Sequence, residues 1–151
     1  MADWKIIQPL TARQWEAYFL LRFEVLRKPW NEPKGSEKSE DDTTSLHTLI
    51  IDNSETAIAV ARIHKLNDNQ CQIRFMAVRT DFQKKGIGKI MLKYAEKLGL
   101  KQYPETTEII LHARENAVPF YESNGYIVDS ESYLLFNSIQ HFLMKKNVSR
   151  S

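Results

Sequence analysis

A glycine- and lysine-rich segment at residues 83–89 contains the residues most suited to chemistry in this sequence. It reads Gln-Lys-Lys-Gly-Ile-Gly-Lys, and an amphipathic helical repeat begins within it. Glycines let backbone N–H groups approach a ligand closely, and a helix N-terminus leaves its first N–H groups unpaired and partly positive. Lys84, Lys85 and Lys89 add full positive charges. The segment therefore predicts a turn that binds a phosphate group, specifically a pyrophosphate.

The spacing excludes two well-known phosphate motifs. A Walker A loop ending at residues 88–89 would need a glycine at position 83 and a serine or threonine at position 90, where the chain has Gln83 and Ile90. A dinucleotide fingerprint beginning at Gly86 would need a glycine at position 91, which is Met91. The pattern that does fit is Gln-x-x-Gly-x-Gly.

This pattern resembles the pyrophosphate loop of the GNAT acetyltransferase superfamily, [Gln/Arg]-x-x-Gly-x-[Gly/Ala]. A second segment, A-V-P-F-Y-E-S-N-G-Y at residues 117–126, resembles that family's A-x-x-F-Y-E-x-x-G-[F/Y] signature. The two signatures occur in the expected order and separation, and the resemblance extends over roughly residues 46–145. It implies that acetyl-CoA is the co-substrate, and that the acetyl group passes by direct attack to a primary amine of a small molecule or peptide.

Periodicity and turn residues predict how the elements alternate. We expect strands at 4–8, 46–51, 56–66, 70–78, 108–113, from 126 and at 141–145. We expect a first helix that follows the N-cap Thr11, with Gln14 completing a capping box, and is ended by Pro29, further helices at 86–100 and 118–123, and a long loop or broken helix at 28–45. A helix between two strands requires a crossover, so the fourth and fifth strands should be parallel. The result is an α/β fold, a mixed sheet of six to seven strands with helices on both faces, in one domain spanning 1–151. The resemblance implies that the fourth and fifth strands splay apart around the pantetheine arm.

The resemblance also assigns the residues that bind the coenzyme. They are Met76, Ala77, Val78, Gln83, Lys84, Lys85, Gly86, Ile87, Gly88, Lys89 and Asn116. Backbone amides of the first three would bond the pantetheine and the developing oxyanion, an effect worth about 3 kcal/mol in comparable sites. Many members carry an asparagine where this chain has Arg114. Asn116 could make the same kind of contact, and Arg114 could instead reach a cofactor phosphate or solvent.

Tyr121 falls on the signature tyrosine that serves as proton donor in the family. A phenol has a pKa of about 10 and a thiol of about 8.5, so the hydroxyl can stabilise a departing thiolate without ionising at neutral pH. The alternative is that Tyr121 is only a packed aromatic ring beside Phe120.

The sequence does not identify the general base. Many members use a glutamate on the fourth strand, where this chain offers Gln72 and Arg74. Other candidates are Glu24, Asp41, Asp42 and His64, each of which could equally be a surface or ion-paired group. The four histidines show no metal-ligand spacing, so no metal is expected.

The acceptor amine is expected between the first helix and the segment 28–45. Residues 21–27, L-R-F-E-V-L-R, resemble a segment of a bacterial GNAT subset whose small-molecule acceptors are unassigned. Arg22 could face a substrate carboxylate, and the acid-rich stretch 31–42 could attract an amine. The alternative is that both carry ordinary surface charges.

Composition limits the classes of partner and the cellular location that can be expected. The net charge is +2, the single cysteine Cys71 forbids an internal disulfide, and no apolar run suggests a leader or a membrane span, so we expect a cytoplasmic protein. A homodimer is compatible with the sequence. Two rivals remain: a non-catalytic CoA-binding regulatory module, and a nucleic-acid binder that uses the lysines of 84–101. The second is disfavoured because Ile87, Ile90, Met91 and Tyr94 are expected in the core and leave no exposed aromatic residues between those lysines.

Overall fold

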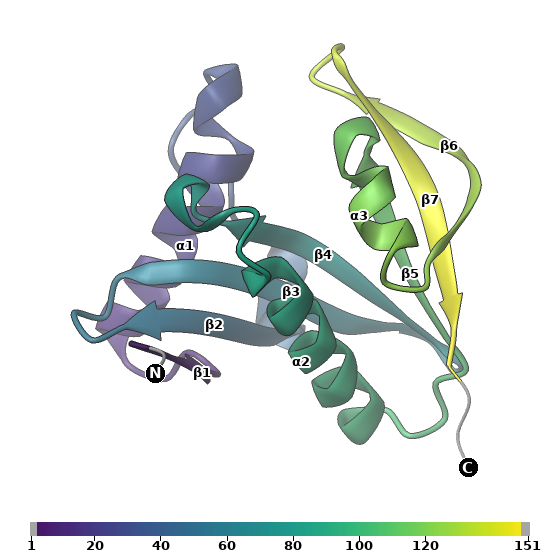
Figure 1. Cartoon of the computed structure of the whole chain (residues 1–151), viewed down its shortest axis with the longest axis horizontal. Helices are drawn as coiled ribbons and strands as arrows, with labels where there is room; N and C mark the ends of the chain where they lie inside the picture. Colours follow the sequence, from purple (N-terminus) through teal and green to yellow (C-terminus); the bar gives the residue numbers. More distant parts are fainter. Residues whose placement is uncertain (1–2, 149–151) are drawn as a thin grey trace.

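The computed structural model describes residues 3–148, whose strands all join one mixed sheet (Figure 1). The strands are β1 Trp4–Ile7, β2 Leu46–Asp52, β3 Ala57–Asn67, β4 Gln70–Val78, β5 Glu108–Arg114, β6 Ile127–Leu135 and β7 Ile139–Asn147. The α-helices are α1 Ala12–Leu26, α2 Ile87–Gln102 and α3 Val118–Glu122. Short 3-10 helices are η1 Lys28–Trp30, η2 Glu40–Thr44, η3 Thr80–Phe82 and η4 Glu115–Ala117.

The strand order is β1-β2-β3-β4-β5-β7-β6. The pair β4–β5 is parallel and the other neighbouring pairs are antiparallel. Both the seven-stranded mixed sheet and the crossover through α2 are therefore as predicted. The sheet contains residues from β1 to β7 and so spans nearly the whole described chain.

The helix termini follow their local sequence. Thr11 Oγ1 accepts a hydrogen bond from Gln14 N at 3.1 Å, and Gln14 Oε1 accepts one from Thr11 N at 3.2 Å, so α1 begins at a capping box. The other main helix, α2, begins differently. Its N-cap is Gly86 at φ +81°, and no side chain caps it. The first N–H groups of α2 are therefore not satisfied by a capping side chain.

Two apolar cores lie on opposite faces of the sheet. Ile50, Ala61 and Ile63 pack with Met91 of α2, whereas the alternate strand residues pack with Tyr18 of α1. This alternation is the two-residue period of a strand covered on both faces. Besides Tyr18, the core on the α1 face contains the buried residues Leu21, Leu26, Leu49, Ile51, Ala57, Val60, Phe75 and Ala77.

The predicted buried face of α2 was partly wrong. Ile87 and Met91 are buried as expected, but Ile90 is 39% exposed and Leu92 is buried in its place. The buried stripe of the helix runs along positions 87, 91, 92, 95 and 99, so position 90 falls at the edge of that stripe.

Strand β4 contains the irregularity that shapes the middle of the sheet. The register on β3 changes from Arg62 opposite Arg74 to Val60 opposite Ala77, which is a β-bulge, and Phe75 within it has φ +58°. The pairing of β4 with β5 covers only residues 70–72 against 108–110. Beyond that point the two strands diverge, as Figure 1 shows, so the predicted splay is present.

The segment 28–45 has more structure than a loop. It holds η1 and η2, of which the second begins with a capping box between Ser39 and Asp42. No helix of the described residues is long and apolar enough to cross a bilayer.

Candidate active site

A cavity of about 860 Å³ occupies the wedge between β4 and β5. The N-terminal turn of α2 and helix α3 line one part of it, and the end of α1 with the β6–β7 hairpin lines another. The cavity is therefore assembled from elements far apart in the sequence. Its size matches the range typical of sites for small molecules and cofactors.

The glycine-lysine turn forms one wall of the cavity, and its two glycines have different structural roles. Gly86 lies in the left-handed region, and a Cβ built on it would meet no atom within 4 Å. A Cβ on Gly88 would lie 3.3 Å from the Phe120 ring, so Gly88 lets α2 pack closely against α3. Gln83 Nε2 donates to Val78 O at 3.0 Å and ties the turn to the end of β4. The N–H groups at the start of α2, which no side chain caps, therefore lie beside open space at Gly86.

Most residues expected to bind the coenzyme line this cavity. They are Met76, Ala77, Val78, Gln83, Lys84, Gly86, Gly88, Lys89 and Asn116. Two others do not. The Ile87 side chain is buried in the core, and the Lys85 ammonium lies 5.3 Å from the centre of the Phe82 ring. Any contact of Ile87 with a ligand would therefore have to come from its backbone N–H, which no side chain caps.

Tyr121 also lines the cavity. Its hydroxyl donates to Met76 Sδ at 3.6 Å, so the phenol of α3 reaches across the wedge to β4. Burial raises the pKa of Tyr121 to about 12, against a smaller opposite effect of Arg114. The group therefore stays protonated at neutral pH and is a hydrogen-bond donor rather than a base.

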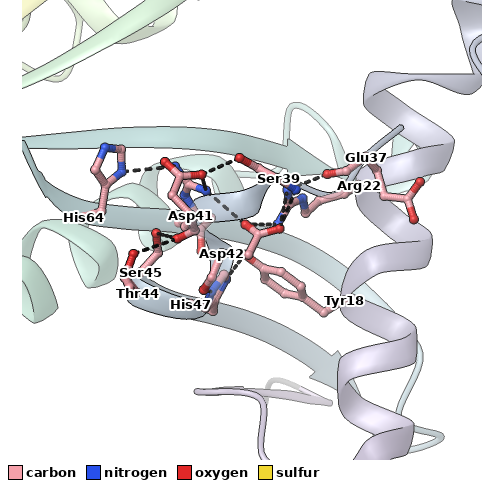
Figure 2. A network of polar contacts seen from close by, with 12 residues as sticks. Tyr18, Arg22, Glu37, Ser39, Asp41, Asp42, Thr44, Ser45, His47 and His64 are labelled. Carbon is pink, nitrogen blue, oxygen red and sulfur yellow. Dashed lines mark hydrogen bonds and ion pairs between the residues drawn. The ribbon is translucent and has the colours of Figure 1, made fainter. Parts of the chain in front are cut away.

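A buried polar network, centred on Asp42, lies outside the cavity (Figure 2). The Asp42 carboxylate accepts from Arg22 Nη1 at 3.1 Å and from Arg62 Nη1 at 3.0 Å. Both guanidiniums are fully buried. His47 joins the network through Asp42 O and the Tyr18 hydroxyl, each at 2.7 Å. The network fastens η2 to α1 and the sheet.

This network corrects the expectations for the acceptor. Arg22 cannot face a substrate carboxylate, because its side chain is fully buried on Asp42; it is not an ordinary surface charge either. Asp41 and Asp42 neutralise Arg62 and Arg22, so they are not free to attract an amine. Of the candidate bases, Glu24, Asp41, Asp42 and His64 all lie outside the residues that line the cavity.

The residues around the open end of the wedge were largely missed. Arg27, Arg74, Arg114, His112, His141 and Tyr133 line the cavity there. In the sequence, Arg74 and Arg114 stand out as departures from the expected glutamate and asparagine, and Arg27 belongs to the family-like segment 21–27. For His112 the sequence signal is the alternation that places it on the same face of β5 as Arg114. Among residues 3–148, no group of three histidine, cysteine or acidic side chains is arranged to hold a metal ion.

Comparison with known proteins decides the family. Residues 23–148 match the sequence profile of the acetyltransferase (GNAT) domain. The chain belongs to the GNAT family of acetyltransferases. An uncharacterised N-acetyltransferase of Bacillus subtilis, YjcF, is 31% identical over 129 residues, which cover 85% of this chain and 89% of that protein.

Solved structures agree with this GNAT fold. The Escherichia coli protein ElaA superposes with a TM-score of 0.81 at 24% identity, over 97% of this chain and 99% of that one. An aminoglycoside 6'-N-acetyltransferase complexed with coenzyme A superposes with a TM-score of 0.76 at 13% identity, over 97% of this chain and 99% of that one. These similarities show the fold, and family membership makes the protein an acyltransferase that moves an acetyl group from acetyl-CoA to an amine.

Proposed function

We propose that this GNAT enzyme binds acetyl-CoA in the wedge, with the pyrophosphate at the turn 83–89. The observation that carries the proposal is the uncapped start of α2 at Gly86, which opens into the cavity. Backbone N–H groups there, with the partial positive charge of a helix N-terminus, suit a doubly charged diphosphate. Lys84 and Lys89 line the same wall and add charge.

The thioester would lie between β4 and α3. Amides of residues 76–78 are close to the bulge, where the strand's edge is free of β5, and they can bond the pantetheine and the carbonyl oxygen. The amine nitrogen forms a bond to the carbonyl carbon, the C–S bond breaks, and coenzyme A leaves as a thiolate. The Tyr121 hydroxyl donates a hydrogen bond to that thiolate.

The amine must lose a proton before or during the attack. No carboxylate is among the residues that line the cavity, so a glutamate base has no counterpart here. His112 and His141 do line it. Burial lowers the pKa of both imidazoles, so they are neutral near pH 7 and able to accept the proton. We therefore favour the imidazole pair for this role over the acids named from the sequence.

Two measurements test the proposal. Calorimetric titration with acetyl-CoA should give saturable heat, and a thiol-release assay should show turnover with a panel of amino acids, polyamines and peptides. Gly86→Val should weaken acetyl-CoA binding at least about tenfold, because a β-branched residue resists the left-handed backbone. Absence of binding by the wild type refutes the proposal, whereas binding without turnover on any amine indicates a CoA-binding regulatory module.

A further inference from the structure

Three guanidiniums meet at the open end of the wedge without an acidic partner. Arg27 follows α1, Arg74 lies on β4 and Arg114 ends β5, and all three line the cavity. Within residues 3–148, none of the three forms an ion pair. Arg22 and Arg62 differ from them, because both form ion pairs with Asp42.

Hydrogen bonds show that two of these guanidiniums are close together. Arg27 Nη1 and Arg114 Nη2 both donate to Leu26 O, at 2.9 and 3.5 Å. Arg27 Nε also donates to Ser36 O at 3.1 Å. The Arg74 guanidinium makes no hydrogen bond within the described residues. The carbonyl groups of Leu26 and Ser36 therefore offset only part of the positive charge of the three arginines.

Aromatic rings hold the three side chains in place. The Arg114 guanidinium carbon lies 4.3 Å from the centre of the Trp30 ring, and that of Arg74 lies 4.4 Å from the Phe75 ring. Arg27 lies 5.6 Å from Phe136, at the tip of the β6–β7 hairpin. A ring face positions a guanidinium but brings no net negative charge.

The electrostatics agree with this geometry. Burial lowers the pKa of Arg27, Arg74 and Arg114; next, Arg74 lowers that of Arg27, Arg27 lowers that of Arg114, and Arg62 of the buried network lowers that of Arg74. Glu32 and Asp41 oppose this for Arg27 and Arg74, but their effects are smaller than that of the nearest guanidinium. Tyr133 lines the same cavity, and burial raises the pKa of its phenol against a smaller opposite effect of all three guanidiniums.

We propose that these arginines form an anion subsite of the acceptor pocket, so that the substrate is a primary amine that also carries a carboxylate or a phosphate. The inference rests on the proposed function. A guanidinium binds either group through two parallel hydrogen bonds, and the half-buried positions of Arg27 and Arg114 strengthen those bonds, whereas Arg74 is exposed. A cavity with three arginines and no acid on its lining disfavours polyamines, whose extra charges are positive.

Matched amine pairs test the subsite through catalysis. Amino acids are compared with their carboxamides, and O-phosphoethanolamine with ethanolamine, after correction for the neutral fraction of each amine. We expect kcat/KM to favour the anionic member by about tenfold or more, and the pair with the larger preference identifies carboxylate or phosphate. Arg74→Gln should remove most of that preference through KM, and Arg74→Lys should keep part of it. Arg13→Gln, on the far exposed pair with Glu55, should change nothing. Equal rates for both members overturn the proposal.

A second measurement does not depend on turnover. Arginine Nε–H signals are followed by NMR in the coenzyme A-loaded protein while each amine is added. Signals of Arg27, Arg74 and Arg114 should shift with the anionic member and not with its neutral partner, whereas those of Arg13 and Arg79 should not move. No shift with any anionic amine overturns the subsite, and so does a shift caused by coenzyme A but not by dephospho-coenzyme A, which would assign the arginines to the cofactor. If acetyl-CoA fails to bind, the amines are added to the protein without coenzyme; a response of the three signals there keeps the anion site and removes only the proposed function.

Discussion

The guanidinium carbon of Arg22 lies 3.9 Å from the centre of the Phe75 ring. Arg22 belongs to the buried network under α1, and Phe75 is the residue of the β4 bulge with φ +58°. The Arg74 guanidinium, which lines the cavity, faces the same ring at 4.4 Å. One aromatic ring therefore connects the network that holds η2 to the bulge that opens the active-site wedge.

Replacing Phe75 tests that connection. Phe75→Leu keeps an apolar side chain but removes the ring from a desolvated guanidinium, so we expect a loss of about 2 kcal/mol or more in the free energy of unfolding, measured by urea denaturation. Phe82→Leu is the control, because Arg79 lies 4.7 Å from that ring, which is only partly buried at the edge of the core. Its cost should stay near 0.5–1 kcal/mol, about the value of an exposed pair. Equal losses in the two variants would contradict a special role for Phe75.

The two aspartates of η2 should differ in their effect on stability. Although burial opposes it, hydrogen bonds from Ser39 N and Arg22 hold the pKa of Asp42 below its usual range. Asp42→Asn leaves Arg22 buried without a counter-charge and should cost about 3–5 kcal/mol. Asp41 is 45% exposed, so Asp41→Asn should cost about 1 kcal/mol or less. Chemical denaturation of both variants decides, and a ranking in the reverse order would show that Asp42 is not the centre of the network.

Stability should fall as the solution is acidified below neutrality. Burial lowers the pKa of His47, despite the opposite effect of Asp42. The unfolded chain therefore binds a proton near pH 6.5 that the folded state refuses, and folding loses free energy as the pH drops through that value. The other three histidines shift in the same direction.

The measurement for this prediction is urea denaturation at pH 7.5 and at pH 5.5. The wild type should be less stable at the lower pH. His47→Gln should show a smaller difference between the two, because one of the contributing groups is gone. A stability that rises on acidification would contradict the prediction, because His47 and the network carboxylates Asp41 and Asp42, whose pKa values are all lowered, can only lose stability as the pH falls.

Tyr121→Phe should separate chemistry from binding. The variant keeps the ring and removes the hydroxyl that reaches Met76 Sδ, so acetyl-CoA affinity should stay within about twofold while kcat falls by about tenfold or more. Stopped-flow thiol release and calorimetry give the two quantities. Phe120→Leu is a structural comparison, since that ring packs on Gly88 and its loss should affect binding of the coenzyme first. Wild-type turnover by Tyr121→Phe would leave Tyr121 as a packing residue.

Short-range sequence patterns were enough to predict many of the helices, strands and turns of this protein. The capping box at Thr11, the strand limits of 70–78 and the uncapped glycine turn before α2 were all readable, because each depends on residues within a few positions. The parallel pairing of β4 and β5 followed from the helix between them. The family signatures added Tyr121 and the wedge.

Tertiary structure alone decided what surrounds the acceptor. Arg27, Arg74 and Arg114 come from three separate elements, and nothing in their local sequence says that they meet, or that Asp42 is taken up by Arg22. The bulge at Phe75 lies where β4 still pairs with β3 but has left β5. Charge compensation and strand divergence depend on contacts between distant residues, so local periodicity does not encode them.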